Sequence, residues 1–429
     1  MKQVKDLEVA IVGAGPVGQF AALLLARKGR SVGIFDNQPH RAVHSYALTL
    51  HSRTLAQLES MDLFSDLLPY GSVVRRLCIH GDEGMHVEVD LAEARGVHPF
   101  VMVVGQSTLE GVLEKALRAT GVRIQWNHRV VAVAERVDGV ELRVDELEDR
   151  VIGYAVAHNE RMVRKSFSVH ADFVLGADGC NSLVRHALGI PFPEVGNAES
   201  YHVYEFTTRE EPTEDMDIVD RAGFLQVRWP VARTGYRWAL QVGDQTGRKI
   251  REDREKNPAL VQWVGNSLYE PLARRDFQEI LRQQAPDLPV SVDNLYWNVL
   301  VRFERRLAAS FGRDRVWLAG DAAHLTGPIG VQSMNVGILE AIAFAEQLDQ
   351  ILDGKAGPES LEIIAEQHRG LWMQYLGLED FVQPSDRVPG ALVKRGSEFF
   401  SWLPASGDDL TNLLIFLGYE VMNEPCGSL

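Results

Sequence analysis

A glycine-spaced turn that follows a short apolar strand places the strongest constraint on how this chain folds. Residues 9–12 (VAIV) form a continuous apolar run, as expected of a strand buried on both faces of a parallel sheet. After this run, Gly13 would permit a tight turn, Gly15 would let the backbone approach a pyrophosphate, and Gly18 would let the following helix pack on the strand. The N-terminal amides of that helix would face the phosphates. The pattern predicts an α/β unit that binds a dinucleotide.

An acidic residue stands where such a unit requires one. Residues 31–35 (SVGIF) are predicted to form the second strand, which ends at Asp36, 18 residues after Gly18. A carboxylate at this position can accept hydrogen bonds from a ribose hydroxyl. The alternative is a glycine-rich turn without a ligand, but the order of strand, helix, strand and acid favours a nucleotide site.

Two further motifs follow apolar strands later in the chain. Residues 177–185 (ADGCNSLVR) and residues 320–324 (GDAAH) each come directly after a short apolar run. Taken alone, the first of these is better explained as an ordinary strand-to-helix turn with Asn181 or Ser182 as its cap. A glycine-containing segment, residues 327–335 (GPIGVQSMN), follows the second motif and precedes a long predicted helix.

In this order and spacing, the three motifs resemble those of the single-component flavoprotein aromatic hydroxylases, the p-hydroxybenzoate hydroxylase-like monooxygenases. The resemblance extends over roughly residues 5–350. It implies an α/β fold in which a Rossmann-like FAD-binding domain is interleaved with an antiparallel-sheet substrate domain and followed by a C-terminal helical region. It also implies the reaction: NADPH or NADH reduces FAD, and a flavin C4a-hydroperoxide formed with O₂ hydroxylates an aromatic or polycyclic small molecule.

The resemblance also assigns roles to individual residues. Asp178 would lie near the nucleotide, Gln106 would approach the flavin at the start of a helix, and Asp321 would bind the ribityl chain. The helix expected at 336–352 would direct the positive end of its dipole at the N1–C2=O side of reduced flavin. The cofactor-binding residues implied in this way are Gly13, Gly15, Pro16, Val17, Gly18, Asp36, Arg41, Gln106, Val130, Asp178, Gly320, Asp321, Gly330, Val331, Met334 and Asn335.

The resemblance places the catalytic positions Pro328, Gly330 and Val331 beside the reacting edge of the flavin. Pro328 has a fixed φ and no N–H, so it would form a stiff, apolar wall. Relatives usually have Gly-Gly-Gln-Gly where this chain has residues 330–333 (GVQS), so we expect Val331 to narrow the pocket. His324 is interpreted as a structural residue and not as a catalytic base.

The chain departs from the family pattern at a second place. Relatives often have an arginine near FAD in the stretch that corresponds to residues 44–48 (HSYAL), where Tyr46 is the best aligned residue. Arg41 is the candidate for the charge role, from a greater distance. Gln106 could equally belong to an ordinary helix N-terminus capped by Ser107, and this reading is compatible with a flavin contact.

The predicted domains are interleaved along the chain. The expected pieces are 1–75, 99–190 and 285–352 for the FAD-binding domain, 76–98 and 191–284 for the substrate-binding sheet domain, and 353–429 for the C-terminal helical extension. The sheet is expected to form the roof of the substrate pocket, although core packing explains each of its aromatic residues at least as well. The candidate substrate-contacting residues are Tyr46, Tyr204, Phe224, Arg228, Trp229, Trp238 and Pro328.

Charge and cysteine content argue against several other classes of protein. With 44 Lys and Arg against 59 Asp and Glu, the formal net charge is −15, which argues against nucleic acid or an anionic membrane surface as a partner. The three cysteines, at positions 78, 180 and 426, show no metal-ligand spacing and no disulfide framework, so we expect no metal and a reducing, cytoplasmic location. Met1–Asp6 is short and polar, so we expect no signal peptide, and the longest apolar run near the C-terminus, Leu413–Leu417, is far too short to span a bilayer.

Two rival functions stay open at this point. One is a flavin enzyme of the same fold that inserts no oxygen, such as a reductase, a dehydrogenase or a halogenase, although the halogenase signature Trp-x-Trp-x-Ile-Pro is absent from the sequence. The other is a non-catalytic FAD-binding protein, for which the altered Val331 and Ser333 would mark lost activity. The sequence leaves open the identity of the substrate, the choice between NADH and NADPH, and the oligomeric state.

Overall fold

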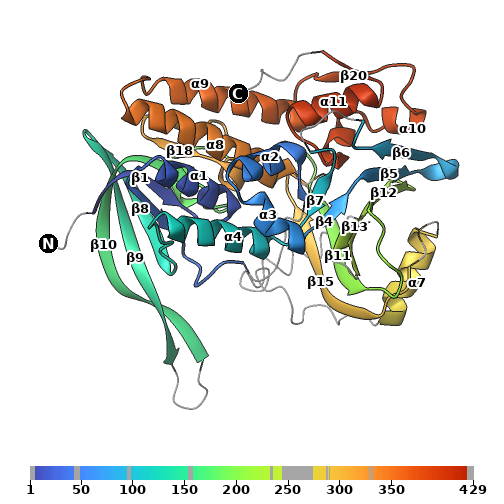
Figure 1. Ribbon diagram of the computed structural model, residues 1–429, viewed down its shortest axis with the longest axis horizontal. Coiled ribbons are helices and arrows are strands. Elements are labelled where there is room, and N and C mark those ends of the chain that lie inside the picture. Colours follow the sequence, from blue (N-terminus) through green and yellow to red (C-terminus); the bar gives the residue numbers. More distant parts are fainter. Residues whose placement is uncertain are drawn as a thin grey trace.

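The structure is a computed structural model that describes residues 5–42, 49–93, 98–152, 158–231, 235–243, 274–286, 288, 290–327, 330 and 332–422. Figure 1 shows two large sheets side by side, the first of them flanked by long helices. Within the described residues, no helix combines the length and apolar character needed to cross a membrane. The same residues contain no group of His, Cys, Asp and Glu side chains arranged to hold a metal ion.

The first sheet contains the apolar strands that precede the three motifs. Its described strands are β1 (Lys5–Val12), β2 (Val32–Phe35), β8 (His128–Arg136), β9 (Gly139–Ile152), β10 (His158–Gly176), β17 (Gly312–Arg313) and β18 (Val316–Leu318). The order is β17-β18-β10-β1-β2, and the hairpin of β8 and β9 pairs with the earlier part of β10. The neighbours β18, β10, β1 and β2 are parallel, and Val9 pairs with both Phe173 and Val32. Both faces are buried, which explains why these strands are continuous apolar runs.

Three long helices pack together beside the first sheet: α1 (Pro16–Arg27), α4 (Gln106–Ala119) and α8 (Gln332–Leu352). Helix α1 begins at Pro16, whose fixed φ suits the first position of a helix. It buries Phe20 and Leu23 completely and contacts both α4 and α8 (Figure 1). A fourth long helix, α9 (Ser360–Tyr375), packs on α8.

The second sheet is almost entirely antiparallel. In spatial order its described strands are β15 (Asn294–Phe303), β11 (Glu199–Thr207), β14 (Gly235–Val242), β13 (Phe224–Val231), β12 (Asp215–Arg221), β5 (Arg76–His80) and β6 (His86–Asp90). Only the pairing of β12 with β5 is parallel. One face, which includes Val203 and Val227, joins the main core. The other face, which includes Tyr204 and Trp238, packs against helix α7 (Arg274–Gln284).

Smaller elements connect the two sheets and complete the C-terminal region. Next to the sheets lie β3 (Thr49–Leu50), α2 (Ser52–Ser60), α3 (Phe64–Leu67), η1 (Leu68–Tyr70), β4 (Ser72–Val74), η2 (Asp82–Gly84), β7 (Val101–Val103), α5 (Leu183–Ala187), β16 (Arg306–Leu307), η4 (Gly320–Ala322) and β19 (His324–Leu325). After α9 come β20 (Val382–Pro384), α10 (Gly390–Val393), η5 (Gly396–Trp402), α11 (Asp408–Phe416) and β21 (Tyr419–Val421). Buried residues of this last region, among them Phe399 and Trp402, belong to the main core.

The two sheets can be compared with the predicted domain pieces. The described strands of the first sheet fall within 1–75, 99–190 and 285–352, and six strands of the second fall within 76–98 and 191–284. Strand β15 pairs with β11 in the second sheet, although its residues lie in the piece expected to belong to the FAD-binding domain. The division into domains itself stays a prediction.

Candidate functional site

The three sequence motifs meet at one edge of the first sheet. They follow directly after β1, β10 and β18, and Asp36 follows β2. These four strands are parallel neighbours, so their carboxyl ends lie at the same edge. Ligands of open parallel sheets bind at this edge. Segments more than 300 residues apart in the sequence therefore form one candidate site.

The three glycines of the first motif differ in the space around them. Gly13 has a φ of +102°, and a methyl group added there would lie 2.2 Å from the carbonyl oxygen of Ala177. A methyl group on Gly18 would lie 2.1 Å from the carbonyl oxygen of Gly13. At Gly15, by contrast, no atom lies within 4 Å of the added group. Gly13 and Gly18 are needed for the protein's own packing, whereas Gly15 leaves a surface that a pyrophosphate can approach.

The carboxylate of Asp36 is already oriented toward the glycine turn. Its Oδ2 accepts a hydrogen bond of 2.7 Å from the backbone N–H of Ala14, and its Oδ1 accepts one of 2.7 Å from the N–H of Gln38. Burial raises the pKa of Asp36, and the two backbone N–H groups act in the opposite direction. An ionised carboxylate has about four acceptor positions, so this one can also accept hydrogen bonds from a ribose.

The second motif caps the N-terminus of a short helix, α5, as its sequence suggested. Ser182 caps α5 by accepting a 2.9 Å hydrogen bond from the N–H of Arg185. Asp178 Oδ2 accepts from the N–H groups of Leu183 (2.7 Å) and Val184 (3.2 Å). The other oxygen, Asp178 Oδ1, is buried and has no hydrogen-bond partner among the described residues. The capping role and a contact with a bound group are therefore compatible.

Arg185 joins the second motif to the third. Its guanidinium donates to the carbonyl oxygens of Cys180 and Ala322, both at 2.7 Å, and lies 3.9 Å from the centre of the Phe192 ring. Burial lowers the pKa of Arg185 from its ordinary value. Arg185 is the last residue of the second motif, but its contact with the carbonyl of Ala322 in the third motif could not be deduced from the sequence.

The third motif is packed tightly between α1 and α8. Gly320 has a φ of +63°, and a methyl group on Gly337 would lie 2.8 Å from the Cα of Gly320. Asp321 is exposed, and its Oδ1 accepts a 2.5 Å hydrogen bond from the hydroxyl of Ser333. The serine that departs from the family pattern thus orients the carboxylate expected to bind the ribityl chain.

Beneath this motif lies a fully buried carboxylate, Glu340. Its Oε2 accepts from the N–H of Gly320 (2.9 Å) and interacts with His324 Nε2 (2.8 Å), and its Oε1 accepts from Trp372 Nε1 (2.7 Å). Burial raises the pKa of Glu340, but His324, His368 and the N–H of Gly320 together outweigh this effect, so the net shift is downward. His324 is itself fully buried and stacks on Trp372 at 3.8 Å, an arrangement that favours its structural interpretation.

The segment expected beneath the flavin is only partly described. Pro328 and Val331, like Tyr46, lie outside the described residues. Gly330 has a φ of +73°, and Met334 is buried. The amide of Asn335 contacts protein backbone: its Nδ2 donates to Thr49 O (2.8 Å), and its Oδ1 accepts from the N–H of His51 (2.9 Å).

Three further predicted cofactor residues, Arg41, Gln106 and Val130, lie on or beside α4 and β8. Gln106 begins α4 and donates to Glu110 Oε1 at 2.8 Å, and Val130 is buried on β8. Arg41 is exposed and lies against α4 at Gly111. It borders an open hollow of about 610 Å³, whose lining consists of His40, Arg41, Ala42, Ser107, Glu114, Arg118 and Trp126.

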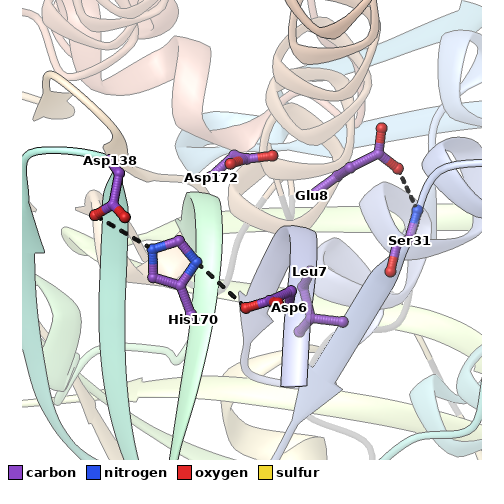
Figure 2. A pocket seen from close by; sticks show the side chains of 7 residues that line it. All are labelled: Asp6, Leu7, Glu8, Ser31, Asp138, His170 and Asp172. Carbon is purple, nitrogen blue, oxygen red and sulfur yellow. Dashed lines mark hydrogen bonds and ion pairs between the residues drawn. The ribbon is translucent and has the colours of Figure 1, made fainter. Parts of the chain in front are cut away.

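A second open hollow, of about 630 Å³, lies near the beginning of β1, away from the motifs. Figure 2 shows His170 between two carboxylates in this hollow; its ring nitrogens lie 3.7 Å from Asp6 Oδ1 and 3.7 Å from Asp138 Oδ1. Glu8 accepts a hydrogen bond from the N–H of Ser31 at its rim. None of the residues that line this hollow was predicted from the sequence to bind cofactor or substrate.

The second sheet separates the predicted substrate residues. Arg228 is buried and donates two hydrogen bonds to Asp217 Oδ2, at 2.9 and 2.6 Å. Tyr204 and Trp238 are buried on the same face, toward α7, and Phe224 is 47% exposed. Of the predicted substrate residues that the structure describes, only Trp229 lies in the main core, on the face that joins the first sheet. Side chains alternate between the faces of a strand, so neighbours in the sequence are divided in space.

A polar group that the sequence analysis missed lies beside residue 327. A methyl group added at Gly327 would lie 3.5 Å from Glu199 Oε2. This oxygen accepts from the hydroxyl of Tyr201 (2.9 Å), and Glu199 Oε1 accepts from Arg305 Nη2 (3.2 Å). Burial, reinforced by the charge of Glu199, raises the pKa of Tyr201 well above its ordinary value, so the phenol is neutral. No short sequence motif marks these three residues.

Comparison with known protein sequences identifies a family. A family model described as FAD binding domain matches residues 6–374. The 6-methylpretetramide 4-monooxygenase of Streptomyces rimosus is 27% identical over 372 residues, which cover 83% of this chain and 58% of that protein. The para-nitrophenol 4-monooxygenase of Pseudomonas sp. (strain WBC-3) is 26% identical over 385 residues, or 86% of this chain and 84% of that protein. A pentachlorophenol 4-monooxygenase of Sphingobium chlorophenolicum is 25% identical, and this chain spans 61% of its length.

Solved structures share the fold over most of the chain. The p-nitrophenol 4-monooxygenase PnpA from Pseudomonas putida DLL-E4 has a TM-score of 0.70 at 21% identity, covering 96% of this chain and 97% of that one. Aklavinone-11 hydroxylase, in a complex with FAD and aklavinone, has a TM-score of 0.64 at 20% identity, covering 88% and 67% of the two chains. The expected fold, a parallel α/β sheet combined with an antiparallel sheet, is confirmed.

Proposed function

Because the chain belongs to the FAD binding domain family, we propose that it is an FAD-dependent monooxygenase that hydroxylates an aromatic or polycyclic small molecule with O₂ and NADPH or NADH. The observation that carries the proposal is the convergence of the three motifs on one sheet edge, with Gly15 open to a pyrophosphate. The names of the relatives, which include monooxygenases of phenols and of a polycyclic compound, support the class of substrate.

The residues at the edge fit an extended dinucleotide. Gly15 and Asp36 would bind its pyrophosphate and ribose, and Asp321, oriented by Ser333, would bind the ribityl chain. Asp178 Oδ1, which has no hydrogen-bond partner among the described residues, would offer one further acceptor. Bound FAD would accept the hydride and activate oxygen, and the protein would supply positioning and dryness. This division of labour explains why the site needs no nucleophile or pair of catalytic carboxylates.

The substrate would bind between residues 327–335 and the face of the second sheet that joins the main core. Trp229 is on that face, and the group of Tyr201, Glu199 and Arg305 borders Gly327. We continue to propose that Pro328, Gly330 and Val331 lie beside the reacting edge of the flavin. Arg228 and Trp238, on the opposite face, would act through the packing of the sheet and not by contact.

The test is a labelled-oxygen experiment on the FAD-loaded protein. The protein is supplied with NADPH or NADH and ¹⁸O₂, and it is screened against phenols, beginning with p-nitrophenol, and against polycyclic aromatic compounds. We expect a substrate that stimulates NAD(P)H oxidation and gives a product that carries one ¹⁸O atom. Asp36→Ala, which should weaken FAD binding by about 1–3 kcal/mol, serves as the cofactor-binding control.

Two results would contradict the proposal. A product without label that differs from the substrate by two hydrogens would identify a reductase or dehydrogenase of the same fold. A protein that binds FAD but consumes no NAD(P)H with any compound, and releases no hydrogen peroxide, would be a non-catalytic FAD-binding protein.

A further inference from the structure

A buried histidine, His51, connects three segments that are remote in the sequence. It directly precedes α2 and is fully buried. Its Nε2 lies 2.8 Å from the carbonyl oxygen of Gly330, and its Nδ1 lies 3.2 Å from the hydroxyl oxygen of Ser406. A carbonyl oxygen can only accept, so Nε2 must carry the proton and donate it to Gly330. Nδ1 of a neutral ring is then an acceptor, and the Ser406 hydroxyl donates to it.

Burial lowers the pKa of His51 to about 3, although the hydrogen bond to Gly330 opposes the shift. The ring is therefore neutral at ordinary pH. A neutral ring with one donor and one acceptor matches its two partners and leaves neither ring nitrogen unpaired. Exchanging the two roles would place the unprotonated Nε2 against a carbonyl oxygen, so the packing selects a single tautomer.

The backbone of the same residue holds the other end of the segment 330–335. The N–H of His51 donates to Asn335 Oδ1 (2.9 Å), and Asn335 Nδ2 donates to Thr49 O (2.8 Å). One residue therefore contacts Gly330 through its side chain and Asn335 through its backbone. Its position fixes both ends of this segment relative to α2.

The C-terminal region closes around Gly330 from another direction. A methyl group added at Gly330, whose φ is +73°, would lie 2.3 Å from Ser401 O and 2.8 Å from Leu403 O. Ser406, the partner of His51, is three residues further along. Segment 401–406 therefore packs against the turn at Gly330 and also supplies the hydroxyl that fixes the ring of His51.

We propose that His51 is a positioning residue for the flavin site: held by Ser406, it fixes the carbonyl of Gly330 through its ring and Asn335 through its backbone N–H, and so sets the places of these two predicted flavin-contacting residues. The proposal rests on the proposed function, because it assumes that FAD binds at this edge. It assigns part of the cofactor site to segment 401–406, which lies beyond the family match at 6–374.

Four variants separate the proposed role from general stability. His51→Phe removes both ring hydrogen bonds and retains an aromatic ring. His51→Gln can restore the donor to Gly330, and Ser406→Ala removes only the hydroxyl. Thr54→Val is the matched control, because Thr54 is fully buried on α2, the helix that follows His51, and its hydroxyl has no partner among the described residues.

Three measurements are made on each variant. Hydrogen–deuterium exchange of a peptide spanning residues 325–336 is measured in FAD-free protein, and the visible spectrum and dissociation constant are measured for bound FAD. For His51→Phe we expect faster exchange, a shifted flavin absorption band and FAD binding weakened about fivefold or more, the factor for one lost hydrogen bond. Ser406→Ala should have a smaller effect in the same direction, His51→Gln should restore most of the loss, and Thr54→Val should match the wild type.

The outcomes distinguish failure of this proposal from failure of the proposed function. A wild-type protein that binds FAD, with His51→Phe unchanged in exchange and flavin spectrum, would overturn the role of His51. Equal impairment of His51→Gln and His51→Phe would overturn it as well. If His51→Phe does not fold, Ser406→Ala decides, because a spectrum and exchange identical to those of the wild type would contradict the proposal. A wild-type protein that takes up no FAD would instead refute the proposed function.

Discussion

Replacing Glu340 by glutamine should destabilise the protein through a hydrogen-bond conflict that can be identified in advance. Both oxygens of this buried carboxylate receive N–H groups, from Gly320 and His324 at Oε2 and from Trp372 at Oε1. In Glu340→Gln, the amide oxygen can retain the two donors at Oε2. The amide NH₂ group then faces the indole N–H of Trp372, so two donors meet and neither is satisfied. The negative charge beside His324 is also lost.

The expected magnitude follows from these contacts. Breaking a buried charged pair by changing one partner typically costs about 3–5 kcal/mol. The side chains of Glu340, His324 and Trp372 are all fully buried, so solvent cannot compensate for the change. Glu340→Gln retains the shape and one acceptor oxygen, and we therefore expect a loss of about 3 kcal/mol in the free energy of unfolding. Trp372→Phe removes a hydrogen bond to a charged group and should cost about 1.5–3 kcal/mol.

The decisive measurement is a double-mutant cycle by urea unfolding, followed by far-UV circular dichroism. In Glu340→Gln/Trp372→Phe the conflicting indole N–H is gone, so the double variant should lose about 1–2 kcal/mol less than the two single variants together. Glu362→Gln, at an exposed site on α9, is the control and should change stability by less than about 0.5 kcal/mol. A loss below about 1 kcal/mol in Glu340→Gln, or additive effects in the cycle, would refute this account of the network.

Two further predictions follow from single contacts. Gly18→Ala should destabilise the fold, since its methyl group would meet Gly13 O at 2.1 Å, whereas Gly15→Ala should unfold like the wild type yet bind FAD less tightly. Equal unfolding midpoints of the two variants, or an FAD titration of Gly15→Ala that matches the wild type, would contradict this difference. Burial raises the pKa of Asp409 to about 6, above its value of about 3.9 in an unfolded chain. The contribution of Asp409 to the free energy of unfolding is therefore fully present below about pH 4 and is lost as the pH rises through about 6. Asp409→Asn, which can still accept from the N–H of Arg53, should remove this loss, up to about 3 kcal/mol, and thermal unfolding at pH 4–8 should show its advantage over the wild type only at the higher pH.

The local parts of the site could be predicted from the sequence because their physics is local. The contact that requires Gly18 is with Gly13, five residues earlier, and the open space at Gly15 belongs to the same turn. Asp36 lies at the end of the next strand, and its hydrogen bond to Ala14 follows from the pairing of the two strands. Apolar runs before each motif predicted buried parallel strands, and parallel strands bring their carboxyl ends to one edge.

The faces of the second sheet could not be assigned in this way. Tyr204, Arg228, Trp229 and Trp238 all lie on strands of this sheet, and all four are buried. Which side of the sheet each one occupies depends on register, because a shift of one residue moves every side chain to the opposite face. The membership of β15 in this sheet depends in the same way on a pairing with β11, which lies about 90 residues earlier.

The sequence by itself was enough to predict the type of fold, the edge where the motifs meet and, within the first turn, the need for glycine at position 18, whose close contact is with Gly13 only five residues earlier. Only the tertiary structure decided what holds the third motif and the segment at Gly330. Glu340 meets Trp372, and His51 meets Gly330 and Ser406, across separations of 32, 279 and 355 residues. Buried polar groups must find partners wherever packing brings them together, and no local spacing records that choice.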